Sequence, residues 1–133
     1  MNDEERLEEI LELLEELKEL SEDHIILTEG IRDKKAMEAL GITGDIFMIQ
    51  SEGGPMKAAE YVSARGKKAV ILTDWDHKGG TISRELELQL SSLDIEYNTE
   101  IRAKLSVLCK KYIKDIESLD TLVERLSFRH KRY

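Results

Sequence analysis

Two short apolar runs that stop abruptly on acidic residues constrain the fold of this chain most strongly. They read IILTEG at residues 25–30 and VILTDWDHKGG at residues 70–80. Each apolar part has the length of a strand, and the acids Glu29, Asp74 and Asp76 follow directly. In a parallel α/β sheet the carboxyl ends of the strands open onto the ligand crevice. We therefore expect these three carboxylates to meet at one edge of a sheet, as an oxygen-rich site for a hard cation such as Mg²⁺.

Strand-like and helix-like patterns alternate along the chain. The expected strands cover residues 24–28, 46–49, 69–73, 95–97 and 113–116, and the expected helices cover residues 3–20, 32–40, 55–65, 82–93, 101–112 and 119–126. Strands separated by helices of about ten residues indicate βαβ units. The expected fold is therefore α/β, with a mostly parallel sheet of four to five strands and helices on both faces. For Glu29 to reach Asp74 and Asp76, the first and third strands must be neighbours, which predicts the strand order 2-1-3-4.

The chain is expected to divide into an amphipathic helix at residues 1–22 and an α/β domain at residues 23–133. Apolar residues repeat on one face of the first segment at helical spacing, with glutamates elsewhere. We expect this helix to pack on the domain, with dimerisation as the alternative. The second segment ends in a helix and a short basic tail.

Charge is distributed unevenly. The net charge is −8, and residues 1–22 hold ten acidic residues against two basic ones, so the rest of the chain is electrically balanced. The composition therefore permits a polyanionic substrate without demanding one. A single cysteine, Cys109, suits a reducing cytoplasm. No apolar run approaches the roughly 20 residues that span a membrane, so we expect a cytoplasmic protein without a membrane partner.

Two motifs in fixed order suggest a family. E-G-x-x-D at residues 29–33 and L-T-D-x-D-x-x-G at residues 72–79 resemble the Toprim domain of topoisomerases and primases. The chain is most similar to small stand-alone members, such as the bacterial nuclease that matures 5S ribosomal RNA. The resemblance covers residues 24–117 and implies the three-layer, Rossmann-like Toprim fold. The chain carries no companion domain with a tyrosine nucleophile and no zinc or polymerase module, so topoisomerase and complete primase activities are not expected.

The resemblance also implies roles for the acids. In the Toprim family the glutamate after the first strand and the Asp-x-Asp after the third bind Mg²⁺ and serve phosphodiester chemistry. Those catalytic and metal-binding roles fall on Glu29, Asp74 and Asp76, with Asp33 as a further metal-binding acid. Glu29 would either complete the coordination or act as general acid or base, and these two roles make opposite demands on its protonation.

The leading hypothesis is a Mg²⁺-dependent phosphodiesterase that acts on nucleic acid, with RNA favoured over DNA and Mn²⁺ as a possible substitute. Its expected phosphate contacts come from basic side chains and glycines near the acids: Arg32, Lys34, Lys78, Gly30 and Gly79. For the three basic side chains, the alternative is that they are solvated surface charges.

Other interpretations stay open. A non-catalytic module could use the same acids to bind metal and nucleic acid, with a protein partner or a second copy of the chain. A phosphatase or phosphotransferase could use Asp74 as a covalent nucleophile. Trp75 could stack on a base or seal the edge of the site, and His77 could serve as an acid–base group or be an exposed loop residue.

Overall fold

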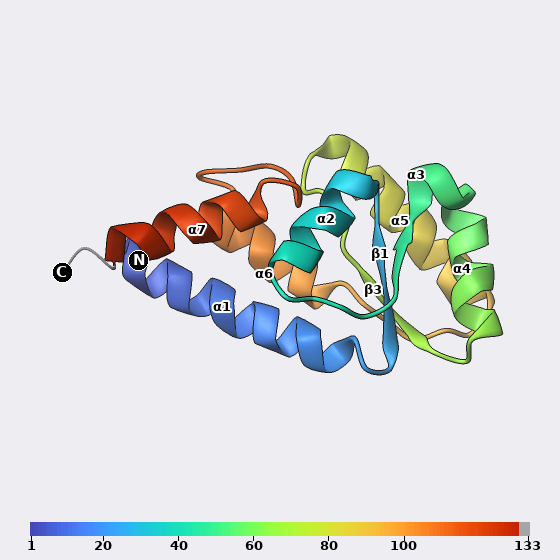
Figure 1. The fold of residues 1–133 in the computed structure, drawn as a ribbon. Coiled ribbons are helices and arrows are strands. Elements are labelled where there is room, and N and C mark those ends of the chain that lie inside the picture. The colour runs from blue at the N-terminus through green and yellow to red at the C-terminus, as the bar shows by residue number, and fades with distance from the viewer. Residues whose placement is uncertain (131–133) are drawn as a thin grey trace.

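A four-stranded, all-parallel sheet forms the centre of the protein (Figure 1), described by a computed structural model for residues 1–130. Its strands are β1 (His24–Thr28), β2 (Ile46–Met48), β3 (Lys68–Ile71) and β4 (Tyr97–Asn98), in the order β2-β1-β3-β4. The predicted order is confirmed: β1 lies beside β3, with Ile25 opposite Ala69 and Leu27 opposite Ile71. The carboxyl ends of β1 and β3 therefore lie side by side, which places the two acidic motifs together.

Helices cover both faces of the sheet, so the expected three-layer, Rossmann-like α/β architecture is confirmed (Figure 1). They are α1 (Asp3–Leu20), α2 (Ile31–Ala39), α3 (Ile49–Glu52), α4 (Gly54–Ala64), α5 (His77–Ser92), α6 (Glu100–Cys109) and α7 (Leu119–His130). Alternate residues of a strand face opposite sides of a sheet. Accordingly, Ile26 and Val70 belong to the core under α1, α2, α6 and α7, whereas Ile25 and Ile71 belong to the core under α4 and α5.

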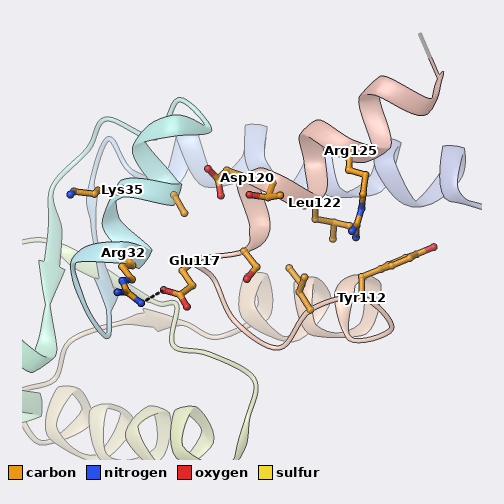
Figure 2. A pocket seen from close by; sticks show the side chains of 11 residues that line it. Arg32, Lys35, Tyr112, Glu117, Asp120, Leu122 and Arg125 are labelled. Atoms are coloured by element: carbon orange, nitrogen blue, oxygen red, sulfur yellow. Dashed lines mark ion pairs between the residues drawn. The ribbon is translucent and has the colours of Figure 1, made fainter. Parts of the chain in front are cut away.

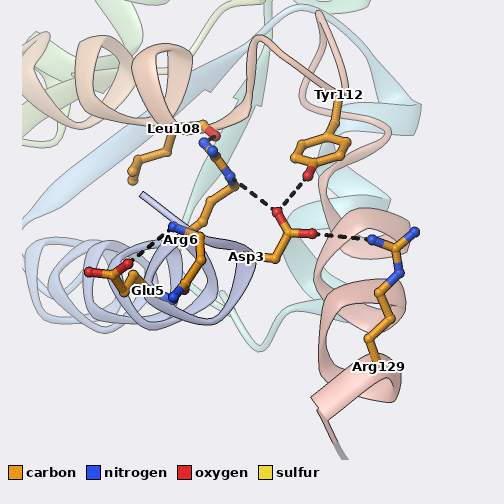
Figure 3. Close-up of polar contacts among 7 residues, drawn as sticks. Asp3, Glu5, Arg6, Leu108, Tyr112 and Arg129 are labelled. Atoms are coloured by element: carbon orange, nitrogen blue, oxygen red, sulfur yellow. Dashed lines mark hydrogen bonds and ion pairs between the residues drawn. The ribbon is translucent and has the colours of Figure 1, made fainter.

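Helix α1 packs into the core that contains Ile26 and Val70, which we call the first core. Asn2 and Glu5 form a capping box at its start, and Leu7, Ile10 and Leu17 are buried against the rest of the domain. Polar contacts join its first turn to distant segments (Figure 3).

Asp3 is the centre of those contacts. It accepts hydrogen bonds from the Tyr112 hydroxyl at 2.5 Å and from Arg129 on α7 at 3.2 Å (Figure 3). Arg6 donates to the Leu108 carbonyl at 2.6 Å. The hydrogen bond from Tyr112 is the main reason that the pKa of Asp3 is lowered. The two ends of the described chain are thereby tied to each other.

The structure corrects several predicted elements. Residues 113–116, expected as a strand, form a loop, and the short helix α3 was not expected. Helix α5 begins at His77, five residues before the predicted start, so His77 and Lys78 lie in a first helical turn and not in a loop. The Asp76 side chain caps that turn by accepting the Gly79 N–H. This cap favours a helix start at His77, although Gly79 and Gly80 disfavour a helix there.

Other expectations have simpler outcomes. Cys109 is buried, and burial raises the pKa of its thiol to about 11, so the thiol has no nucleophilic character at neutral pH. Of the helices within residues 1–130, none has both the length and the apolar character that a membrane crossing requires. The end of the basic tail, residues 131–133, lies outside the described residues.

Candidate functional site

Glu29 follows β1 and anchors the site. Its side chain is buried, with 4% exposed, and its Oε2 accepts a hydrogen bond from the Asp74 backbone N–H at 2.8 Å. This bond connects the end of β1 to the turn after β3. The first motif therefore fixes the geometry of the second.

Asp74 and Asp76 lie where the chain leaves β3. Asp74 Oδ1 accepts from the backbone N–H of Ile116 at 2.9 Å, and Asp76 Oδ1 accepts from the N–H of Gly79 at 2.7 Å. Trp75, between them, turns toward the first core and donates its indole N–H to the Ile113 carbonyl at 2.8 Å. The structure thus gives Trp75 a packing role, and its two acidic neighbours line one cavity.

Asp33 is the fourth acid and belongs to the first turn of α2. It is buried, with 6% exposed, and its Oδ2 accepts from the Gly30 backbone N–H at 2.9 Å. A side chain added to Gly30 would meet the Gln50 amide oxygen at 2.9 Å. That oxygen is the end of a flexible side chain, so a larger residue at position 30 would displace Gln50 and not the backbone.

The four carboxylates line a cavity of about 420 Å³ at the carboxyl edge of the sheet. The remaining lining residues include Gly30, Ile31, Arg32, Gln50, Lys78, Asp115 and Glu117. Among the predicted phosphate contacts, Arg32, Lys78 and Gly30 therefore belong to the cavity wall. Lys34 and Gly79 do not, and the amide of Gly79 is occupied by Asp76.

Each of these four acids uses one oxygen to hold the backbone and leaves the other without an N–H donor from the described residues. The oxygens so engaged are Glu29 Oε2, Asp33 Oδ2, Asp74 Oδ1 and Asp76 Oδ1. The second oxygens are the donor type that Mg²⁺ and Mn²⁺ prefer. Within residues 1–130, no group of three or more His, Cys, Asp or Glu side chains is arranged so that it could hold a metal ion. The acids therefore line an open cavity and do not form a cage.

Burial and like charge oppose ionisation at the centre of the cavity. Burial is the largest cause that raises the pKa of Asp74 to about 7; the hydrogen bond from Ile116 opposes this shift, and the Asp33 and Glu29 carboxylates add to it. Burial also raises the pKa of Asp33, against the hydrogen bond from Gly30. A cation in the cavity would favour the ionised forms of both groups.

Arg102 on α6 is a site residue that sequence reasoning missed. Its Nε donates to the Thr73 carbonyl at 2.9 Å and its Nη2 to the Asp74 carbonyl at 2.6 Å. Burial lowers its pKa, whereas the nearby charges of Glu29 and Asp74 raise it. Arg102 thus supports the turn after β3 from behind and supplies a fixed positive charge near the acids.

Of the other residues that sequence reasoning missed, some could have been predicted from the sequence and others could not. Gln50 follows β2 as Glu29 follows β1, so the predicted strand order could have placed it at the same edge. Asp115 and Glu117 reach the cavity from a loop that was predicted to be a strand, and no local pattern marks them. His77 is exposed and does not line the cavity.

The fold and this edge define a class: a three-layer α/β protein with an open, carboxylate-rich cavity where parallel strands end. The chain belongs to the UPF0292 family. It is 39% identical to a UPF0292 protein of Methanosarcina barkeri, over 93% of this chain and 87% of that protein. It is also 34% identical to one of Methanocaldococcus jannaschii, over 96% of this chain and 100% of that protein.

Two further comparisons complete this result. No family model matches the chain. Among solved structures, a putative protein from Aquifex aeolicus is similar with a TM-score of 0.69 and 28% identity, over 80% of this chain and 94% of that one. This similarity supports the α/β architecture.

Proposed function

We propose that this protein carries out Mg²⁺-dependent phosphodiester chemistry on nucleic acid, as an RNA endonuclease or processing enzyme of the Toprim class. One observation carries the proposal. Glu29, Asp33, Asp74 and Asp76 come from two segments far apart in the sequence and line one cavity, and each leaves a carboxylate oxygen without an N–H donor from the described residues.

The donor set fits the metal. Mg²⁺ keeps several waters and is commonly held by only one or two carboxylates, so an open cavity suits it better than a closed cage. Asp74 and Asp76 are the expected ligands, with Asp33 and Glu29 close by. When bound, Mg²⁺ supplies positive charge that polarises the scissile phosphate and stabilises the leaving oxygen.

The remaining roles fall on residues around the acids. Glu29 either completes the coordination or handles a proton. Arg32 and Lys78 line the same cavity and are the basic side chains that would contact the phosphate backbone. Arg102 holds the carbonyls of Thr73 and Asp74, which positions the acidic turn without contact to the substrate.

The test is a cleavage assay. Structured and single-stranded RNA and DNA are incubated with Mg²⁺ or Mn²⁺, with wild type beside Glu29→Gln, Asp74→Asn and Glu85→Gln. Both site substitutions keep an oxygen that accepts the existing backbone hydrogen bond, and Glu85 is an exposed acid on α5 outside the cavity. We expect metal-dependent RNA cleavage that falls at least about 100-fold in the two site variants and is unchanged in Glu85→Gln.

A non-catalytic metal- and nucleic-acid-binding module is the second candidate. One observation favours it: Glu29, Asp33, Asp74 and Asp76 each already hold a backbone N–H, as expected of residues kept for the fold alone. Wild type that binds RNA and cuts no substrate with either metal would support this candidate and contradict the nuclease.

A further inference from the structure

A second cavity, of about 630 Å³, adjoins the acidic one where α2 approaches α7 and the loop after α6 (Figure 2). Three cations and one aromatic ring line it: Arg32 and Lys35 from α2, Arg125 from α7, and Tyr112. We call this set the cationic groove. Only Arg32 has a part in the proposed phosphodiester chemistry.

The charges of the groove are available to a ligand. Lys35 and Arg125 are exposed, and neither forms an ion pair with a carboxylate of the described residues. Arg32 is 83% exposed and lies 4.0 Å from Glu117, at the outer limit of an ion pair. Elsewhere on the surface, by contrast, Lys57 and Lys104 pair with glutamates of their own helices at 3.4 and 2.8 Å.

The aromatic ring organises one of these charges. The Arg125 guanidinium lies 5.8 Å from the centroid of the Tyr112 ring (Figure 2), which Lys111 and Arg6 also approach, at 5.5 and 5.6 Å. The Tyr112 hydroxyl is held by Asp3, so the ring itself is fixed. A guanidinium held near a fixed ring loses less freedom when it binds phosphate, and the ring lines the cavity, where a base could stack on it.

The groove leads to the acids. Arg32 and Glu117 line both cavities, so a chain of phosphates bound along Lys35 and Arg125 would pass Arg32 before it reaches Asp74. The two acids of the groove, Glu117 and Asp120, limit its affinity for bare phosphate. A ribose 2′-hydroxyl, however, can donate to a carboxylate.

From these observations we propose that the cationic groove binds single-stranded RNA and delivers it to the acidic cavity. The inference rests on the proposed function and deepens it by assigning the substrate class and its binding surface. Cations that follow a backbone, together with an aromatic platform, are the pattern of single-strand recognition. A cavity of this volume suits one or two nucleotides better than a duplex or a folded protein partner.

The experiment measures binding without catalysis. A fluorescein-labelled single-stranded RNA of about 12 nucleotides, which exceeds the site size of many single-strand binders, is titrated with full-length protein in EDTA, and anisotropy is followed at several salt concentrations. The double variant Lys35→Gln/Arg125→Gln is compared with Lys57→Gln/Arg84→Gln, which removes equal charge from α4 and α5 on the other face of the sheet.

We expect the groove variant to lose at least about fivefold in affinity and to reduce the salt slope by about 1.4, because each lost phosphate contact on a single strand contributes about 0.7. The control variant should bind like wild type. Absence of RNA binding by wild type, equal losses in groove and control variants, or equally tight binding of duplex RNA or single-stranded DNA would overturn the proposal.

The two proposals fail in different ways. Groove-dependent binding without any cleavage in Mg²⁺ would retain the groove and reject the nuclease. Cleavage that depends on Glu29 and Asp74, with binding unaffected by Lys35 and Arg125, would retain the nuclease and reject the groove.

Discussion

Asp74 is held in place by three neighbouring groups and also lines the candidate site. Its backbone N–H is held by Glu29, its carbonyl by Arg102, and one carboxylate oxygen by the N–H of Ile116. Burial and neighbouring carboxylates nevertheless make its charge unfavourable. A side chain that is fixed so firmly in an environment that disfavours its charged form is typical of a functional site.

The pKa of Asp74 predicts how stability changes with pH. Its pKa is raised from 3.8 to about 7 in the folded protein, so the folded state binds more protons between these values and loses stability as pH rises through them. Asp74→Asn removes this loss and can keep the hydrogen bond from Ile116. We expect the variant to be more stable than wild type at pH 7.5, by about 1 kcal/mol after allowance for solvent screening, and the advantage to vanish near pH 4.

Urea unfolding at several pH values, with and without Mg²⁺, measures this effect. Mg²⁺ at about ten times its Kd should stabilise wild type by about 1.4 kcal/mol and Asp74→Asn by much less. Glu85→Gln is the control and should follow wild type. A stability difference between Asp74→Asn and wild type that does not change from pH 4 to 7.5 would contradict the assigned cause.

At the scale of elements, the start of α5 is packed unusually tightly against the acidic turn. A side chain on Gly79 would come within 1.8 Å of the Asp74 carbonyl oxygen, whereas one on Gly80 would find its nearest neighbour, an Arg84 nitrogen, at 3.6 Å. Gly79 therefore has a steric reason to be glycine, because only glycine lets the first turn of α5 lie on the turn after β3. Gly80 has no such reason.

This difference predicts opposite effects for two adjacent substitutions. Gly79→Ala should destabilise the protein by about 2–3 kcal/mol or more, because backbone must move to relieve the overlap. Gly80→Ala should be neutral or stabilise by up to about 1 kcal/mol, because alanine favours a helix interior over glycine. Thermal and urea unfolding of both variants measure the effects. Similar stability of the two would show that the close contact at Gly79 relaxes easily.

The elements also show what the sequence could and could not predict. Alternation of apolar runs and amphipathic helices predicted the layers, and the requirement that Glu29 meet Asp74 predicted the strand order. The layers follow from periodicity, which is a local signal, whereas the strand order follows from the chemistry expected of acids at the strand ends. The loop at residues 113–116 was predicted as a strand because Ile113 and Ile116 are apolar, yet they pack on the core from irregular backbone.

Tertiary contacts account for the rest. That loop is held by the Trp75 indole and the Asp74 carboxylate, 38 and 42 residues away in the chain. Arg102 likewise reaches the site only because α6 packs behind the turn after β3. Such partners have no signature at short sequence distance, so the acids of the two motifs were predictable, whereas their supporting residues and the acids of the loop, Asp115 and Glu117, were not.

At the scale of the whole molecule, charge is separated between α1 and the cationic groove. The first 22 residues carry ten acids and two bases, and Asp3 contacts Tyr112 at one end of the groove (Figure 3). The exposed face of α1 therefore lies close enough to repel a polyanion that approaches the groove. Long-range repulsion of this kind changes affinity without any contact and is screened by salt.

We therefore predict that Glu8→Gln/Glu12→Gln/Glu19→Gln increases the affinity for single-stranded RNA by roughly 3- to 10-fold in 10 mM salt. All three residues are exposed on α1 and lie outside the groove. The screening length is about 30 Å at 10 mM salt and about 8 Å at 150 mM, so the advantage should shrink toward unity over this range. Anisotropy titrations across the range measure it, and thermal melting checks that the fold is unchanged. An advantage that persists at 150 mM would indicate a direct contact with α1 in place of repulsion at a distance.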